Sequence, residues 1–343
     1  PLYPVQWSPK KINAPEAWDI YTGSPQTIVA VVDTGVDYNH RDLRDNIWVN
    51  EAELNGTNGV DDDRNGYIDD IHGYNFIYNN SDPIDDNGHG THCSGIIAAE
   101  GDNSLDITGV CWNTKIMALK FLGSLGEGSI TDAVRAIYYA VANGADVISN
   151  SWGTSDDSKL LKDAIDYAYS QGVIIAASAG NDDYSGSPRY PAGYERVISV
   201  AATDSNDNKW SLSNYGDWVD IAAPGVDVLS LRAEGTSANT PYDQYTVILS
   251  GTSIACPHIA GSCALLLSAN PLMTYDELYS ILMRTADPIA PGICLSDGRV
   301  NLSKAMHAVI PSRGYINLDH DYYACGGVVG LLLADWDLKD KGS

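Results

Sequence analysis

Residues 250–261 read Ser-Gly-Thr-Ser-Ile-Ala-Cys-Pro-His-Ile-Ala-Gly, and small apolar residues continue from this stretch to Ala269. Such a composition predicts a helix that is buried on all sides. Gly251 allows a tight turn at the start, and Thr252 and Ser253 fall where N-cap residues are expected. The Ser253 hydroxyl would then lie at a helix N-terminus, where unpaired N–H groups favour developing negative charge. A serine that only caps the helix is the alternative.

Continuous apolar runs rich in β-branched residues recur along the chain, with helical patterns between them. Continuous rather than alternating apolar strands are typical of parallel sheets that are covered on both faces. We predict helices over residues 130–143 and 159–171, and a late helix opened by a capping box at Thr274. The predicted strands are residues 27–32, 116–122, 146–149, 173–177, 197–202, 219–222 and 245–249. This alternation predicts an α/β fold, an open, mostly parallel twisted sheet with helices on both faces.

The chain is strongly acidic, with 45 acidic against 20 basic residues and a formal net charge of −25. Such a chain repels nucleic acid and anionic membranes and attracts cations. No apolar run approaches membrane-spanning length, so we expect neither a nucleic-acid nor a membrane partner. A calcium-rich secreted protein and a halophilic protein share this composition, and composition alone does not separate them.

Six cysteines in a chain of 343 residues do not make a disulfide framework, and no CxxC pair indicates a structural zinc site. Cys93, Cys256 and Cys263 lie in apolar helical runs, which predicts buried thiols. Cys294 and Cys325 lie in late loops, and the sequence leaves open whether they pair.

Two further stretches supply a base and an acid. Residues 87–95 read Asn-Gly-His-Gly-Thr-His-Cys-Ser-Gly and open an apolar helix, so His89 would be uncrowded and close to a cleft. Asp33 ends a buried strand in the sequence Val-Asp-Thr-Gly. Alone, His89 would be an ordinary loop residue and Asp33 a turn carboxylate. Hydrolysis by a serine needs a hydroxyl, a base that takes its proton and a buried acid that fixes the imidazolium, and the three residues together supply them.

The motifs DTG, HGTH and GTSxAxPHxAG, in this order, resemble those of the subtilase family of serine endopeptidases. The similarity runs from about Trp7 to about Ala308, and the order of acid, histidine and serine is that of subtilisin. The resemblance implies a subtilisin-like peptidase domain over residues 1–309 that hydrolyses peptide bonds through an acyl-enzyme on the serine. A catalytically silent binding module is the alternative, and the intact set of motifs argues against it.

The resemblance implies further site residues. Asn181, in the segment Ser-Ala-Gly-Asn, would donate its side-chain amide to the tetrahedral oxyanion, with the Ser253 backbone N–H as second donor. A peptide would bind as an extended strand between two segments of the enzyme. The residues of these segments are Ser151, Trp152 and Gly153 on one side and Gly126 and Gly128 on the other. Trp152, Ile130 and Ala133 would shape apolar subsites, although Ala133 has an ordinary core role as its alternative.

Arg189 departs from the family pattern, which has a small or acidic residue at the floor of the primary specificity pocket in many members. A guanidinium there would pair with an acidic side chain on the substrate residue before the cut. The alternative is that Arg189 turns out to solvent and leaves an apolar pocket.

Residues 61–70 place oxygen-bearing side chains at positions 1, 3, 5 and 9 around a glycine at position 6, as in the first part of an EF-hand loop. His72 stands where the closing Glu would be, and the flanks do not indicate two helices. We therefore predict an inserted calcium-binding loop, with an acidic surface turn as the alternative. Its candidate ligands are Asp61, Asp63, Asn65, Tyr67 and Asp69.

The resemblance also implies a second calcium site that joins Asp42 to the loop after the His89 helix. Its candidate ligands are Asp42, Asn103, Leu105 and Ile107, and Gln6 lies near enough in the chain to join them. We thus expect a secreted, calcium-stabilised, monomeric enzyme that acts on polypeptide substrates. Residues 310–343 fall beyond the resemblance, and strands predicted at 315–318, 328–333 and 334–338 indicate a partial β-rich C-terminal extension.

Overall fold

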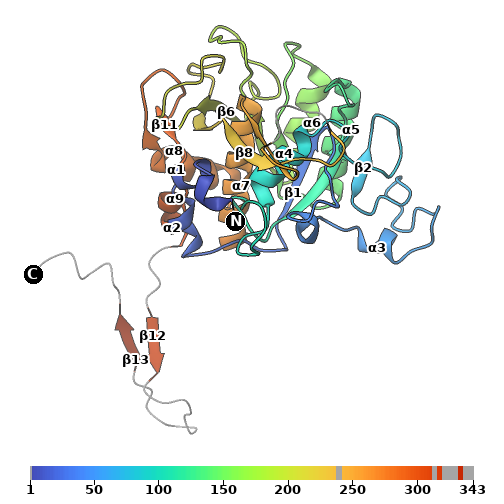
Figure 1. Cartoon of the computed structure of the whole chain (residues 1–343), viewed down its shortest axis with the longest axis horizontal. Coiled ribbons are helices and arrows are strands. Elements are labelled where there is room, and N and C mark those ends of the chain that lie inside the picture. Colours follow the sequence, from blue (N-terminus) through green and yellow to red (C-terminus); the bar gives the residue numbers. More distant parts are fainter. Residues whose placement is uncertain (1, 237–241, 311–314, 319–330, 335–343) are drawn as a thin grey trace, which may run out of the picture.

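In a computed structural model, residues 2–236 and 242–310 are described in full, together with the backbone of two strands at 315–318 and 331–334. A nine-stranded sheet lies at the centre, in the order β10-β11-β7-β6-β5-β4-β1-β3-β2 (Figure 1). All neighbours pair in parallel except β10 and β11. The strands are β1 (Ile28–Asp33), β2 (Gly73–Asn75), β3 (Lys115–Lys120), β4 (Val147–Asn150), β5 (Ile174–Ser178), β6 (Ile198–Thr203), β7 (Ile221–Pro224), β10 (Asp287–Pro288) and β11 (Gly298–Arg299).

Two antiparallel ribbons stand outside this sheet. One pairs β8 (Val228–Leu231) with β9 (Thr246–Leu249), and the other pairs β12 (Tyr315–Leu318) with β13 (Leu331–Ala334). The second ribbon bears out the strand predicted at 315–318 and part of the one at 328–333. Residues 328–330 and 335–338 lie outside the described residues, and a separate C-terminal unit over 310–343 stays a prediction.

Successive residues of each strand point to opposite faces of the sheet. Both faces are apolar, and helices cover both of them. In β1, Val29 and Val31 belong to one apolar core, and Ala30 and Val32 belong to another. The first core is shared with α2, α4, α7, α8 and α9, and the second with α5 and α6. The helices are α1 (Ser8–Lys11), α2 (Ala14–Trp18), α3 (Glu51–Leu54), α4 (His89–Ala98), α5 (Ile130–Ala142), α6 (Lys159–Ser170), α7 (Thr252–Ala269), α8 (Tyr275–Thr285) and α9 (Leu302–Val309).

The predicted fold class is confirmed, as are the capping box at Thr274 and the helices at 130–143 and 159–171, within a residue or two. The short strands β2, β8, β10 and β11 and the helix α9 were not predicted. They contain two to four residues in the strands and eight in α9, which leaves little room for a periodic pattern.

α7 is the central helix of the first core, and 16 of its 18 residues are buried. By length and composition it is apolar enough to cross a membrane, contrary to the expectation that no run approaches that length, yet 89% of it is buried inside the protein. Its cap also differs from the prediction. Gly251 is the N-cap, and Thr252 and Ser253 are the first two helical residues.

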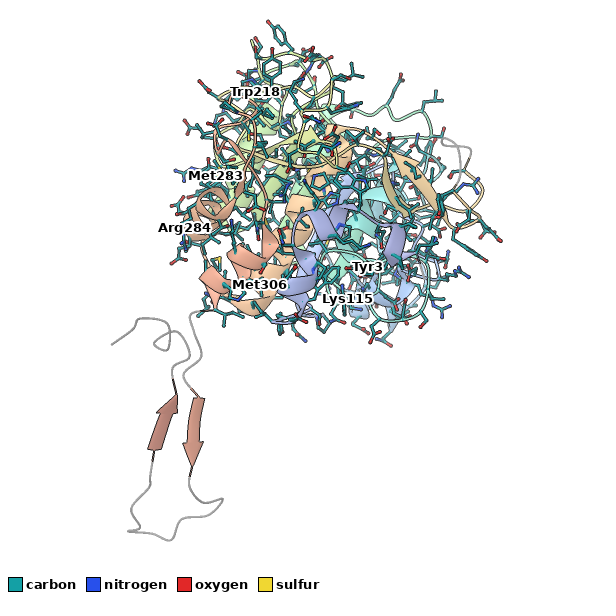
Figure 2. The ribbon with its side chains drawn as sticks, turned by 60° about the vertical axis from the view of Figure 1, so that its left-hand side comes forward. Tyr3, Lys115, Trp218, Met283, Arg284 and Met306 are labelled. Carbon is teal, nitrogen blue, oxygen red and sulfur yellow. The ribbon has the colours of Figure 1, made fainter. Side chains whose placement is uncertain are left out.

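The N-terminal arm packs against the C-terminal helix of the domain. The Leu302 N–H donates to the Ile12 carbonyl (2.7 Å), and Arg299 Nη1 donates to the Lys11 carbonyl. Figure 2 labels Tyr3 and Met306, on the arm and on α9. The buried Arg299 side chain also meets Asp207 (2.8 Å) and Asp287 (3.0 Å), so a single guanidinium joins segments that are far apart in the sequence.

Candidate active site

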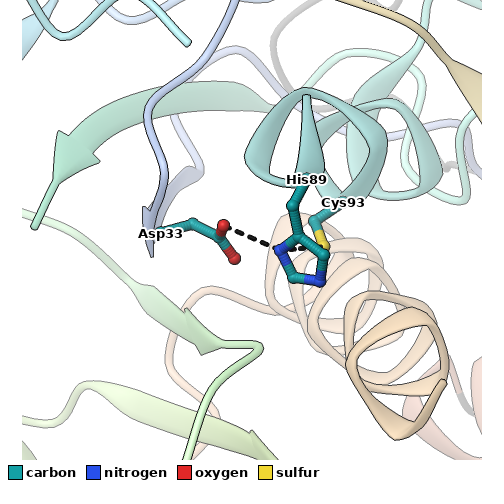
Figure 3. A group of neighbouring side chains, drawn as sticks. All are labelled: Asp33, His89 and Cys93. Atoms are coloured by element: carbon teal, nitrogen blue, oxygen red, sulfur yellow. Dashed lines mark hydrogen bonds and ion pairs between the residues drawn. The ribbon is translucent and has the colours of Figure 1, made fainter. Parts of the chain in front are cut away.

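Asp33 and His89 meet at the carboxyl end of β1 and the first residue of α4 (Figure 3). Asp33 is fully buried, and its Oδ1 accepts from His89 Nδ1 (2.8 Å) and from the Thr34 N–H (2.7 Å). Since Nδ1 carries the proton in that bond, Nε2 is the basic nitrogen of the neutral ring. A buried acid that fixes the tautomer of a histidine is the arrangement a general base requires.

Two opposing effects act on the pKa of His89. Burial lowers it, and the adjacent Asp33 carboxylate raises it; the net result is a pKa well above the ordinary value of 6.5. Cys93 lies 4.0 Å from His89 Nδ1 (Figure 3), but burial raises the pKa of this thiol. A neutral thiol adds little charge, so we attribute the raised pKa of His89 to Asp33.

A buried carboxylate organises the loop that presents His89. Asp85 accepts hydrogen bonds from the Thr34 hydroxyl (2.9 Å), from the Gly88 N–H (2.8 Å) and from both the backbone and the hydroxyl of Thr91. The Thr34 hydroxyl in turn accepts from the Gly90 N–H (2.9 Å). The strand end that carries Asp33 and the helix start that carries His89 are therefore held by one network.

The first turn of α7 brings Ser253 to the same place. Pro257, inside this helix, has no N–H, so the Ser253 carbonyl lacks its usual helical donor. That carbonyl instead accepts from Ser151 Oγ (2.8 Å), just after β4, and from Cys93 Sγ (3.4 Å), one turn along α4 from His89. Cys93 thus contacts both His89 and the Ser253 backbone. Within the described part of the chain no hydrogen bond joins the His89 ring to Ser253 Oγ, and such bonds often tighten only when substrate binds.

Asn181 follows β5 and is fixed by Thr252. Its Oδ1 accepts from the Thr252 N–H (3.0 Å) and from the Thr252 hydroxyl (2.7 Å), and that hydroxyl accepts from the Gly180 N–H (3.0 Å). Because the amide oxygen is held, Nδ2 is left to face the start of α7. A Cβ built on Gly251 would lie 3.7 Å from Nδ2 and 3.0 Å from Ser253 Oγ, so both atoms border one space. This role of Thr252 was not predicted from the sequence.

A cavity of about 490 Å³ adjoins this space. Its lining includes the predicted residues Ser151, Trp152, Gly153, Asn181, Arg189 and Ser253. Gly126, Gly128 and Ile130 do not line it. Gly126 and Gly128 lie in an exposed loop, and Ile130 is the half-buried first residue of α5. Ala133 is fully buried in the second core, so its alternative as an ordinary core residue is the correct one.

Arg189 is only partly turned to solvent. It lines the cavity with a side chain that is 34% exposed, and its Nη2 lies 2.8 Å from Asp182 Oδ2. A guanidinium predicted to pair with an acidic substrate side chain is therefore already paired with Asp182, a contact that was not predicted from the sequence.

The acidic loop after α3 gathers only part of the predicted ligand set. Oxygen atoms of Asp61, Asp63 and Glu53 lie within 4.8 Å of one another. No basic side chain of the described residues forms an ion pair with these three carboxylates, so the cluster suits a hard cation such as Ca²⁺. Glu53 on α3 was missed because it lies outside the loop motif.

The other predicted residues of this loop have different partners. Asp69 lies outside the cluster, and both of its oxygens accept from the Gly59 N–H (3.0 and 2.9 Å). Asn65 Oδ1 accepts from the Tyr67 N–H (2.8 Å), and the Tyr67 ring packs edge-on against Tyr74 and Tyr139. Asp69 thus lies outside the cluster that Glu53 forms with Asp61 and Asp63, and its role as a calcium ligand stays a prediction.

The second predicted calcium set is brought together by the loop after α4. Asp42 is fully buried, and it accepts from Asn103 Nδ2 (2.7 Å) and the Ile107 N–H (2.9 Å). Burial raises the pKa of Asp42 to about 6. Asn103 Oδ1 accepts from the Leu105 N–H (2.9 Å), and Gln6 forms two hydrogen bonds with the Thr108 backbone at the end of this loop. N–H groups of Asn103 and Ile107 thus face Asp42, and Asn103 Oδ1 and Gln6 Oε1 each accept from a backbone N–H, so a calcium ion at this loop stays a prediction.

An open parallel α/β sheet that carries an Asp–His pair beside a serine at a helix N-terminus defines a serine hydrolase of the acyl-enzyme class. Comparisons with known proteins agree. The model of the subtilase family matches residues 24–316. Thermitase from Thermoactinomyces vulgaris is 39% identical over 302 residues, which cover 88% of this chain and 95% of thermitase. The thermophilic serine proteinase of Bacillus sp. (strain AK1) is 38% identical, over 88% of this chain and 67% of the relative.

Subtilisin-like protease 1 of Plasmodium falciparum (isolate 3D7) is 35% identical, over 85% of this chain and 45% of the relative. This chain belongs to the subtilase family. It is a subtilisin-like serine endopeptidase, and the resemblance drawn from its three motifs is confirmed.

Proposed function

We propose that this subtilase cleaves polypeptides with Ser253 as nucleophile, His89 as general base and Asp33 as the acid that orients the histidine. The Asp33–His89 hydrogen bond of 2.8 Å beside the first turn of α7 is the observation that carries the assignment. Nε2 of His89 takes the Ser253 proton as Oγ bonds to the scissile carbonyl carbon, and the carbonyl oxygen becomes an oxyanion. Asn181 Nδ2 and the Ser253 N–H donate to that oxyanion. Collapse expels the amine, which takes the proton from His89, and water then releases the acyl group by the same steps.

The substrate would lie as an extended strand between two segments of the enzyme. Ser151, Trp152 and Gly153, which line the cavity, form one side, and Gly126 and Gly128 form the other. The Trp152 ring packs at a tilt against Phe121 with ring centroids 4.8 Å apart, which gives this side an apolar wall. Ile130 at the start of α5 would complete the apolar subsites.

Calcium would be held in two places. Asp61, Asp63 and Glu53, with Asn65 and the Tyr67 carbonyl, would hold one ion, and Asp42, Asn103, Leu105 and Ile107 the other. The ion supplies a positive charge that allows carboxylates to sit together. Binding to the folded state alone would stabilise the enzyme by mass action.

The net charge of −25 supports an enzyme that stays soluble in a calcium-containing medium outside the cell. We propose that the protein is secreted, acts as a monomer on polypeptide substrates, and has neither a nucleic-acid nor a membrane partner. The alternative is a catalytically silent module that only binds. Such a module would not need the buried Asp33 carboxylate that orients His89.

A serine-directed fluorophosphonate probe tests the assignment. The wild-type protein is expected to be labelled and to hydrolyse casein, and Ser253→Ala is expected to do neither while its melting temperature is unchanged. Labelling that persists in Ser253→Ala would show that the nucleophile is another residue.

A further inference from the structure

We propose that Arg189 and Asp182 together form a subsite that selects a carboxamide side chain, glutamine or asparagine, on the substrate residue before the scissile bond. This inference rests on the proposed function. Both residues line the 490 Å³ cavity that also contains Ser253 and Asn181. The attacked carbonyl must lie between Ser253 Oγ and Asn181 Nδ2, so the side chain of the same substrate residue enters this cavity.

Two glycines form the slot that holds the stem of Arg189. A Cβ built on Gly180 would lie 2.8 Å from Arg189 Cγ, and one built on Gly153 would lie 3.3 Å from Arg189 Cβ. Gly180 also has a φ of +102°, where a side chain would be strained. The arginine stem therefore passes close to both backbones and occupies volume that a large aromatic substrate side chain would need.

Asp182 holds the guanidinium from one side only. Nε (2.9 Å) and Nη2 (2.8 Å) of Arg189 both contact the same oxygen, Oδ2 of Asp182. Asp182 is itself fixed by Asn214, which is fully buried and whose Oδ1 accepts from the Asp182 N–H (3.0 Å). Within the described residues, Nη1 of Arg189 and Oδ1 of Asp182 have no hydrogen-bond partner.

A free donor and a free acceptor on a paired arginine and aspartate match a carboxamide. The carboxamide oxygen accepts from Arg189 Nη1, and its NH₂ group donates to Asp182 Oδ1. A carboxylate would satisfy the arginine but would face the aspartate, and an ammonium would face the arginine. The pair carries no net charge, so neither charged side chain gains what the carboxamide gains.

The test uses fluorogenic peptides that differ only in the residue before the scissile bond: Gln, Glu, Lys and Phe. Wild-type kcat/KM is expected to be at least about tenfold higher for Gln than for Glu or Lys. Asp182→Asn is expected to raise the Glu/Gln ratio about tenfold, because the repelling carboxylate is gone. Arg189→Gly is expected to raise kcat/KM for Phe, because the stem is removed.

Asp183→Asn is the matched control. This substitution removes the same charge from the neighbouring residue. Asp183 pairs with Lys209 (2.7 Å) and does not line the cavity. The inference is overturned if Gln is not preferred, or if Asp182→Asn shifts the Glu/Gln ratio no more than Asp183→Asn does. Probe labelling with a flat profile would refute the subsite alone. Loss of both labelling and all hydrolysis would refute the proposed function and the subsite with it.

Discussion

Thr252→Val is predicted to weaken catalysis through Asn181. Thr252 is fully buried, and valine has nearly the same shape without the hydroxyl. The substitution removes one of the two hydrogen bonds that hold Asn181 Oδ1, the one of 2.7 Å, and leaves the 3.0 Å bond from the Thr252 N–H. A hydrogen bond of this kind contributes about 0.5–1.5 kcal/mol. If that energy keeps Nδ2 aimed at the oxyanion, kcat falls roughly 2- to 13-fold, since about 1.4 kcal/mol corresponds to a factor of ten.

The expected signature is a lower kcat with an unchanged KM, because the oxyanion exists only in the transition state and the intermediate. The assay is steady-state hydrolysis of one peptide by four proteins: wild type, Thr252→Val, Asn181→Ala and the double variant. Asn181→Ala should lower kcat about 10²–10³-fold, the magnitude established for this donor in subtilisin itself. Thr252→Ser, which keeps a hydroxyl, is the matched control and should retain most of the wild-type kcat.

The double variant decides between an effect through Asn181 and a general one. If Thr252 acts by fixing Asn181, its replacement should cost nothing further in kcat once Asn181 is alanine. Full additivity of the two losses would refute the reasoning. The free energy of unfolding should fall in both backgrounds by about 0.5–1.5 kcal/mol, because the half-buried Gly180 N–H loses its acceptor.

Three further predictions concern Asp33, the two proposed calcium sites and the buried Arg299 side chain. His89 is a base only when neutral and its pKa is raised, so the acidic limb of kcat/KM against pH should lie above 6.5; Asp33→Asn should move that limb to lower pH and lower kcat about 10⁴-fold. Chelation of calcium should lower the melting temperature. Relative to calcium at a hundredfold excess over its Kd, the free energy of unfolding should fall by about 2.7 kcal/mol. Glu53→Gln should reduce the effect of calcium on the melting temperature, and Asp69→Asn should not. If Asp69→Asn reduced it and Glu53→Gln did not, the ligand set predicted from the sequence would be the correct one. Arg299→Met should lower the free energy of unfolding by about 1–3 kcal/mol in a denaturant titration without changing kcat, because Asp207 and Asp287 lose the buried guanidinium while Lys11 and Lys304 still pair with them. An unchanged midpoint would contradict this role.

The sequence predicted the features that depend on local pattern. Buried β-branched runs mark parallel strands whatever lies around them, so Asp33 at the end of β1 was placed correctly. Glu53 could not be predicted as a neighbour of Asp61, because the loop that brings them together has no periodic pattern. The same holds for Asp182, whose pairing with Arg189 no local pattern indicates, and for Thr252, which the pattern predicted as a cap. Tertiary contacts decided each of these cases.

The geometry of the site follows from the opposed directions of the sheet and α7. β1, β4 and β5 are parallel neighbours, so Asp33 at the end of β1, Ser151 after β4 and Asn181 after β5 lie at the same edge of the sheet. α7 reaches that edge with its N-terminus, where its unpaired N–H groups and the Ser253 hydroxyl are available. Because Pro257 has no N–H, the Ser253 carbonyl is free to accept hydrogen bonds from Ser151 and Cys93. These two bonds hold the first turn of α7 against the end of β4 and against α4. A residue that weakens one helical hydrogen bond therefore fixes the nucleophile against the segments that carry the substrate and the base.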